Sequence, residues 1–149
     1  MYNWLVIVNL AAAFYNVGTI WLTQVDWQLW KYVSKDTFGA YHLAWWHSVW
    51  WSIFPVAGIS FLGICAQVLW HPGVPTWMVW LALIIQIFAY SGTAFWWGRG
   101  QAKLKQAVLP NGDVDSQYTI LVRTHWIRVA LFTFAGIVQL WIALLHFTH

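Results

Sequence analysis

Charged residues are scarce in this chain of 149 residues. They make up 7% of the sequence, and all the acidic residues are aspartates, so glutamate is absent. A soluble domain carries about 25% charged residues, which excludes an ordinary soluble fold. Disorder is excluded as well, because 61% of the residues are hydrophobic and disordered segments hold few apolar residues. The composition indicates an integral membrane protein.

Cysteine pairs and basic runs are absent too. The single cysteine, Cys65, has no disulfide partner in the chain and belongs to no zinc-ligand pattern. The seven Lys and Arg residues form no dense run, so nucleic acid is not an expected partner. The chain also lacks a Ser-His-Asp pattern and a glycine-rich phosphate loop. No motif therefore names a reaction.

Long apolar stretches are what the chain does contain. A helix needs about 20 mostly apolar residues to cross a bilayer. The sequence offers such stretches at about 4–25, 44–70, 76–98 and 120–146. Pro72 and Pro75 separate the second from the third, because proline disrupts a helix interior. Pro110-Asn111-Gly112-Asp113 predicts a turn in the loop before the fourth. The sequence predicts one all-α domain, a four-helix transmembrane bundle.

The basic residues lie on one side of this predicted bundle. The two longer connectors and the first turns of the fourth span hold them all: Lys31, Lys35, Arg99, Lys103, Lys105, Arg123 and Arg128. Cytoplasmic loops are enriched in Lys and Arg. Both connectors are therefore expected in the cytoplasm, and both termini outside.

The first connector has a helical pattern of its own. Trp27, Trp30, Val33 and Phe38 recur at near-helical spacing, with polar residues opposite. An amphipathic segment lying in the membrane interface over about 26–41 explains this pattern. A continuation of the first span is the alternative.

Tryptophan is abundant, with 15 residues. Indole rings favour the headgroup level of a bilayer, which predicts two aromatic belts. The cytoplasmic belt is expected to hold Trp27, Trp30, Trp45, Trp46, Trp96, Trp97 and Trp126, and the outer belt Trp4, Trp70, Trp77 and Trp141. Trp21, Trp50, Trp51 and Trp80 lie deeper. Aromatic faces stack on one another, so these deeper rings are candidates to line a pocket for a flat ring system.

Polar residues inside the predicted spans are the candidates for function. Asn9, Asn16 and Thr23 are spaced by seven residues, close to two helical turns, and so share a face. Such a face typically forms a helix–helix seam, and the alternative is the polar wall of a cavity.

Arg128 lies about two turns inside the fourth span, and His125 points the same way because residues three apart on a helix are neighbours. An arginine at that depth is costly unless it is paired, solvated or snorkelling. The expected partner is Asp26 or Gln24, at the cytoplasmic end of the first span, or the backbone carbonyls there. A structural ion pair or snorkelling and a ligand-binding role stay open for Arg128.

Three histidines lie toward the same end. His47 and His125 sit at similar depths in their spans, so they are candidate axial ligands of a haem. His42 is an alternative partner for His125, whereas His42 and His47 are about 140° apart around one helix and cannot pair on one face. Hydrogen bonding at the interface is the other explanation. A metal site is not expected, because it needs three or four ligands and carboxylates are few.

Several short motifs together resemble a known family. They are Gln24, Leu29-Trp30-Lys31-Tyr32-Val33, Phe38-Gly39-Ala40-Tyr41-His42 and Leu121-Val122-Arg123-Thr124-His125-Trp126-Ile127-Arg128. This pattern resembles small uncharacterised four-pass bacterial membrane proteins related to the anthrone-oxygenase-like group. The resemblance implies a four-helix bundle in the bacterial inner membrane. It also implies a pocket for a polycyclic or quinone-like compound, with Tyr41, His42, His125 and Arg128 near its polar end.

Three functions stay open. The first is an enzyme or binder of a hydrophobic aromatic or quinone-like compound at the cytoplasmic end of the bundle. His42 or His125 would act as the base and Arg128 would stabilise an enolate-like oxygen, which suits a cofactor-independent oxygenase. The expected ligand-binding residues are Gln24, Asp26, Tyr41, His47, Trp50, Arg123 and Trp126. The second function is an accessory subunit of a respiratory or photosynthetic membrane complex, with Trp-rich faces against partner helices. The third is a haem-b electron carrier that uses His47 or His42 with His125.

Overall fold

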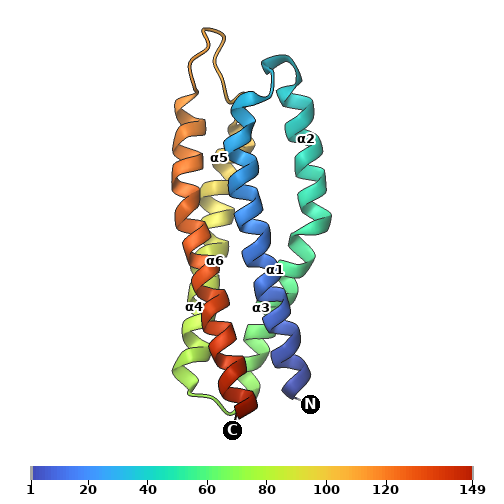
Figure 1. The fold of residues 1–149 in the computed structure, drawn as a ribbon, viewed down its shortest axis with the longest axis vertical. Helices are drawn as coiled ribbons and strands as arrows, with labels where there is room; N and C mark the ends of the chain where they lie inside the picture. The colour runs from blue at the N-terminus through green and yellow to red at the C-terminus, as the bar shows by residue number, and fades with distance from the viewer. Residues whose placement is uncertain (1, 149) are drawn as a thin grey trace.

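The chain folds into four long helical rods that lie side by side (Figure 1). The structure is a computed structural model that describes residues 2–148. The rods are α1 (Tyr2–Leu29), α2 (Lys35–Ser52) with α3 (Phe54–Trp70), α4 (Thr76–Gly92) with α5 (Gly98–Lys103), and α6 (Ser116–Thr148). Each rod is long and apolar enough to cross a membrane. The predicted all-α bundle of four membrane-length helices is confirmed.

The connectors divide between the two ends of the bundle. The termini lie at the same end as the short turn between α3 and α4 (Figure 1). The opposite end, which we call the loop end, carries the turn between α1 and α2 and the hairpin-like loop before α6. In that loop the amide of Leu109 donates to the carbonyl of Asp113 at 2.7 Å, and Gly112 has φ +90°. The predicted turn over 110–113 is confirmed.

The helices extend further than the apolar stretches that predicted them. α1 continues past 25 to Leu29, α2 begins at Lys35 instead of 44, and α6 begins at Ser116 instead of 120. The segment 26–41 forms no separate amphipathic interfacial helix. It is divided between the end of α1, a 3-10 turn at Trp30–Tyr32 and the start of α2. The reason is that hydropathy detects only the apolar part of a helix, whereas the i to i−4 hydrogen bonds continue into polar flanks.

A break separates α2 from α3 inside the second rod. Pro55 accounts for it, because proline has no N–H and its ring crowds the carbonyl four residues earlier, that of Trp51. The backbone of α2 comes close only to that of α3, the continuation of its own rod, whereas α1 packs closely against both α3 and α6 among the described residues. Figure 1 shows α2 standing apart from α1 above the break. This separation opens the side of the bundle where the groove described below lies.

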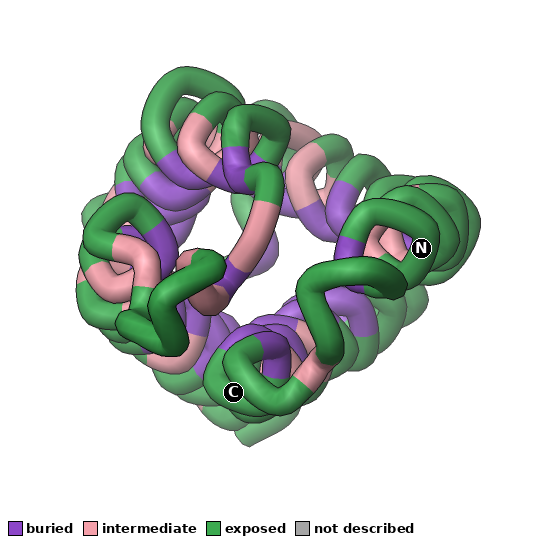
Figure 2. The backbone as a smooth tube through the Cα atoms, turned by 90° about the horizontal axis from the view of Figure 1, so that it is seen from above, coloured by how far each residue is buried: buried purple, intermediate pink, exposed green. Residues whose placement is uncertain are grey.

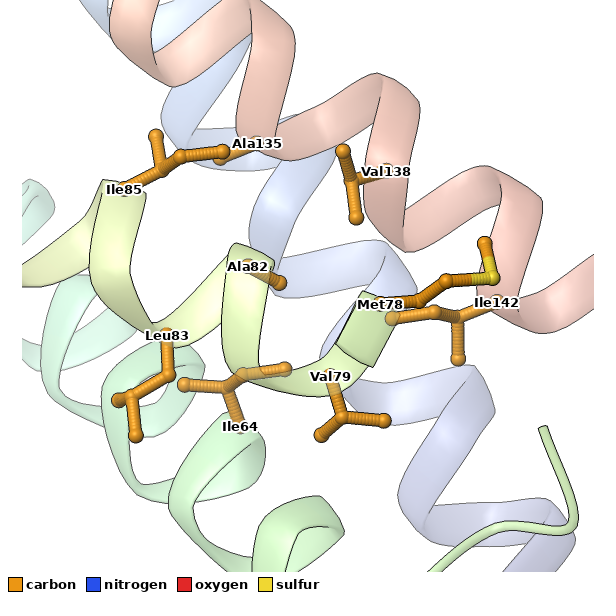
Figure 3. Packing of buried hydrophobic residues seen from close by; sticks show 9 residues of the cluster. All are labelled: Ile64, Met78, Val79, Ala82, Leu83, Ile85, Ala135, Val138 and Ile142. Atoms are coloured by element: carbon orange, nitrogen blue, oxygen red, sulfur yellow. The ribbon is translucent and has the colours of Figure 1, made fainter. Parts of the chain in front are cut away.

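Apolar side chains fill the bundle toward the termini. Figure 2 shows that the buried positions face the middle of the bundle. A cluster from α3, α4 and α6 consists of Ile64, Met78, Val79, Ala82, Leu83, Ile85, Ala135, Val138 and Ile142 (Figure 3). Between helices in lipid, close van der Waals packing stabilises such contacts more than exclusion of water does.

The polar face of α1 lies in the interior. Asn9, Asn16 and Thr23 are buried, and Asn16 Nδ2 donates to the hydroxyl of Tyr90 at 3.4 Å. Gly63 lets the helices approach, because a Cβ there would lie 2.9 Å from the side chain of Asn9. The predicted helix–helix seam is confirmed for Asn9 and Asn16, whereas Thr23 lies in the wall of a cavity, the alternative that the sequence left open.

The tryptophans predicted for the cytoplasmic belt divide into three groups. Trp27, Trp30 and Trp97 are buried at the loop end, in a cluster with Phe38 and Tyr118. For these three the belt prediction is wrong, because they point into the bundle. Trp45 and Trp46 are half-buried. Trp96 and Trp126 are exposed, and so are the four tryptophans predicted for the outer belt.

Candidate functional site

A buried histidine–glutamine pair joins α6 to α1 near the loop end. Nδ1 of His125 lies 2.7 Å from Oε1 of Gln24, and Nε2 of Gln24 donates to the carbonyl of Val122 at 3.4 Å. An amide oxygen only accepts, so Nδ1 carries the proton and Nε2 keeps its lone pair. Nε2 of His125 is buried and has no partner in the described part of the chain.

Aromatic rings enclose this pair. The imidazole of His125 lies 4.3 Å from the indole of Trp27, and Trp27 lies 5.6 Å from Trp30. Trp30 in turn lies 5.2 Å from the imidazole of His42, which stacks on Phe38 at 5.7 Å. The two imidazoles are thus joined through two fully buried indoles.

The haem alternative does not fit this arrangement. A haem between His42 and His125 would have to displace both Trp27 and Trp30. His47 is exposed on the outer surface of α2, where it lines a depression with Trp50 and other residues near the helix break. His47 and His125 therefore do not face each other. In residues 2–148 no three His, Cys, Asp or Glu side chains gather as metal ligands do.

Asp26 and Tyr41 link α1 to α2. The hydroxyl of Tyr41 donates to Oδ1 of Asp26 at 2.9 Å. Oδ2 of Asp26 is buried and has no partner among the described residues. A second hydrogen bond joins the same two helices, because the hydroxyl of Tyr15 donates to the carbonyl of Ser52 at 2.7 Å. The rings of Trp27 and Trp45 also meet between them, with ring centres 6.3 Å apart.

A groove of about 330 Å³ runs between α1 and α2 beside this contact. It is open to the side of the bundle, where lipid would lie. Its walls are apolar at Leu22 and Val49 and polar at several hydroxyl side chains. The lining residues are Tyr15, Thr19, Leu22, Thr23, Asp26, Trp45, Ser48, Val49, Ser52 and Ile53.

A second, more enclosed space lies next to the groove, and we call it the inner cavity. Its volume is about 30 Å³, and Arg128 lies in its wall. The other lining residues are Thr23, Trp45, Trp46, Val49, Ile53, Phe54, Thr93, Gly98 and Gln101. Thr23, Trp45, Val49 and Ile53 line both spaces, so the groove and the inner cavity adjoin.

The pairing predicted for Arg128 is wrong. Gln24 binds His125, and Asp26 accepts from Tyr41 through one oxygen only. Nε of Arg128 is buried without a hydrogen-bond partner in residues 2–148, and its guanidinium carbon lies 5.9 Å from the ring centre of Phe132. Arg128 thus meets an aromatic face and not a carboxylate.

The remaining predicted site residues lie on the outer surface. Arg123 and Trp126 are exposed on α6, and Trp126 packs edge-on against Trp21 at 5.4 Å. Trp50 is 60% exposed. The structure thus brings Asp26 to the groove and Arg128 to the inner cavity, whereas neither His42 nor His125 is among the residues that line these two spaces.

No family model, curated protein or solved structure matches this chain. The resemblance to the anthrone-oxygenase-like group stays a prediction. Only the chemistry and geometry of the site itself indicate a function for this chain.

The structure adds site residues that the sequence did not indicate. Gln101 lies in a stretch predicted as loop, and Thr93 lies in a π-helical segment, Thr93–Trp97. Both line the inner cavity. π-Helical turns are rare and often occur at functional sites. The sequence signal closest to this site was Thr23, on the polar face of α1.

Proposed function

We propose that this chain is a multi-pass membrane protein that binds a hydrophobic aromatic or quinone-like compound in the groove between α1 and α2. The observation that carries the proposal is the groove itself, about 330 Å³ in volume. Pockets for small molecules are about 300–1,000 Å³ and mostly apolar, with a few polar groups that fix orientation. Leu22, Val49 and Ile53 offer the apolar wall, and Asp26 offers a buried, unpartnered oxygen.

Aromatic side chains at the groove suit a flat ligand. Trp45 lines the groove. It packs edge-to-face against Trp30, with ring centres 5.4 Å apart. A rigid indole offers a large stacking surface at small entropic cost. The open side would admit a ligand from the lipid phase, where hydrophobic compounds concentrate.

The proposal is for binding and includes no catalytic step. An oxygenase would need a base at the ligand, and the predicted bases His42 and His125 are packed among Trp27, Trp30 and Phe38. The expected base therefore stands apart from the groove. We also propose the inner membrane of a bacterium with the loop end in the cytoplasm, because Lys31, Lys35, Lys103 and Lys105 gather at that end.

A groove-filling variant tests the proposal. Purified protein in neutral-lipid nanodiscs is titrated with decylubiquinone and with 2-naphthol, and quenching of tryptophan fluorescence is followed. Ser48→Phe places a ring in the groove and is expected to weaken binding about tenfold or more, as for a ligand that loses much of its contact area. Ala40→Phe, at an exposed position of the same helix, is the matched control. Equal binding by both variants would contradict the proposal.

A second candidate function is favoured by Trp50 and Trp51. They lie near the middle of the rod Lys35–Trp70 and are 60% and 85% exposed. Tryptophan normally occupies the membrane interfaces, so two exposed indoles at mid-span suit contact with another protein. This supports an accessory subunit of a larger membrane complex. Blue native electrophoresis of the native membrane tests it, since Trp51→Leu should then release the chain from a large complex.

A further inference from the structure

We propose that the ligand of the groove is an anionic amphiphile, specifically a hydrophobic carboxylate whose carboxylate enters the inner cavity and binds Arg128 and Gln101. This inference rests on the proposed function. It further specifies that the polar end of the ligand is negatively charged and small. Arg128 lies in the inner cavity, next to the groove that would hold the apolar body.

Arginine stays protonated in proteins, and a cation among membrane helices needs a counter-charge or water. Among residues 2–148, none of the four aspartates is hydrogen-bonded to Arg128. Asp26 accepts from Tyr41, Asp113 accepts from Asn111, and Asp115 caps the first turn of α6 through the amide of Gln117. Asp36 is exposed in the first turn of α2. A counter-charge or water from outside the described residues must therefore meet Arg128.

Arg128 and Gln101 both lie in the wall of the inner cavity. Nε of Arg128 and Nε2 of Gln101 are buried donors without a partner in residues 2–148, and Gln101 is 3% exposed. The hydroxyls of Thr23 and Thr93 donate to backbone carbonyls of their own helices, at 2.8 Å and 2.7 Å. These two unpartnered buried atoms are both donors, so they suit an acceptor. A carboxylate is an acceptor-only group, and it pairs with arginine through two parallel hydrogen bonds.

The size of the inner cavity limits the polar end of the ligand. Its volume is about 30 Å³, which is room for a group of about one or two water-sized atoms. A carboxylate is a small group that meets this limit. The adjoining groove of about 330 Å³ then takes the apolar body. A small anionic head and a larger apolar body describe the same molecule.

The local backbone shapes the cavity wall. Thr93–Trp97 is π-helical, and Thr93 and Gly98, at its two ends, both line the inner cavity. A Cβ on Gly98 would lie 2.7 Å from the carbonyl oxygen of Thr93, so only glycine fits there. The widened turn leads directly into α5, which carries Gln101.

A matched pair of fluorescent probes tests the inference. Pyrenebutyric acid and pyrenebutanol share the same apolar body and differ in charge. Binding to the protein in phosphatidylcholine nanodiscs is measured by energy transfer from tryptophan to pyrene. The wild type should bind the acid about tenfold or more tightly than the alcohol, as charge-assisted hydrogen bonds allow.

Single substitutions test whether Arg128 and Gln101 cause the preference for the acid. Arg128→Gln should abolish it while binding of the alcohol stays unchanged, and Gln101→Leu should reduce it. The two substitutions lie on different helices, so a folding defect in one still leaves the other as a test. Arg99→Gln removes an exposed positive charge of α5 and should leave the preference for the acid unchanged.

The outcomes separate the two proposals. Equal binding of acid and alcohol by the wild type would overturn the inference and leave the groove proposal standing. Binding of neither probe would overturn both. Replacing part of the phosphatidylcholine by phosphatidylglycerol distinguishes the source of the anion. Loss of acid binding in those discs, dependent on Arg128, would assign the cavity to a lipid headgroup and overturn the carboxylate ligand.

Discussion

Nδ1 of His125 and Oε1 of Gln24 are 2.7 Å apart across the interface of α6 and α1, and both residues are almost completely buried. The bond orients the imidazole and fixes its proton on Nδ1. It also joins two residues that are far apart in the sequence. The pair is thus a specific link between the first and last helices at the loop end.

Removing either residue of this pair should destabilise the bundle, because the other residue is then buried without a hydrogen-bond partner. Gln24→Leu or His125→Leu leaves one buried polar group without a partner, at a cost of about 1–3 kcal/mol. The double variant removes both groups, so its loss should be smaller than the sum of the single losses. Unfolding by sodium dodecyl sulfate in mixed micelles measures the three free energies. Strict additivity would show that the bond contributes no coupling.

Tyr41→Phe should loosen α2 from α1. It removes the hydroxyl that donates to Asp26, one of two hydrogen bonds between these helices in residues 2–148, the other being that of Tyr15 with the carbonyl of Ser52. Tyr41 is 38% exposed, so the stability cost should be small, about 1 kcal/mol or less. Spin labels on the exposed faces of α1 and α2 should report a broader distance distribution. Tyr32→Phe, at an exposed tyrosine near the same turn, should leave the distribution unchanged.

The number of membrane-length helices was predictable, because apolar stretches of about 20 residues typically form transmembrane helices. Pro72, Pro75 and the polar loops mark where these stretches end. The buried face of Asn9, Asn16 and Thr23 was predictable for a similar reason, since a seven-residue spacing fixes one face of a helix. These features depend on local sequence alone.

The site depends on how the helices meet, which the sequence does not specify. The position of Trp27 and Trp30 along the chain predicted correctly that they lie near one end of the bundle. It did not predict that their side chains point into the bundle. The partner of Arg128 was predicted wrongly because the competing bonds from His125 to Gln24 and from Tyr41 to Asp26 join residues distant in sequence. Gln101 was missed because it follows a π-helical segment inside a stretch without apolar periodicity.

Tyr118 closes the end of α1, and Tyr118→Phe should open it. The hydroxyl donates to the carbonyl of Trp27 at 2.7 Å and contacts that of Gln28 at 3.2 Å. The last carbonyls of a helix have no partner within it, so the variant should cost about 1–2 kcal/mol. Hydrogen exchange should rise selectively near the end of α1. A uniform rise along the whole chain would instead indicate general destabilisation and contradict this role.

Glycine-to-alanine substitutions test the π-helical wall of the inner cavity. A Cβ on Gly98 would lie 2.7 Å from the carbonyl oxygen of Thr93, which is backbone and cannot move alone, whereas a Cβ on Gly58 meets nothing within 4 Å. Gly98→Ala should therefore destabilise the protein by about 1–3 kcal/mol through overpacking. Gly58→Ala should be neutral or stabilising by up to about 1 kcal/mol, because alanine is the better helix former.

The same pair of variants reports on ligand binding. Gly98→Ala should also weaken binding of pyrenebutyric acid, because the wall that holds Thr93 and Gln101 must shift, whereas Gly58→Ala should bind it as the wild type does. Unfolding in mixed micelles gives the stabilities, and tryptophan-to-pyrene energy transfer gives the affinities. A Gly98→Ala protein with wild-type stability would show that the π-helical turn is absent in the folded protein. Such a result would contradict the placement of Thr93 and Gln101 in the wall of the inner cavity.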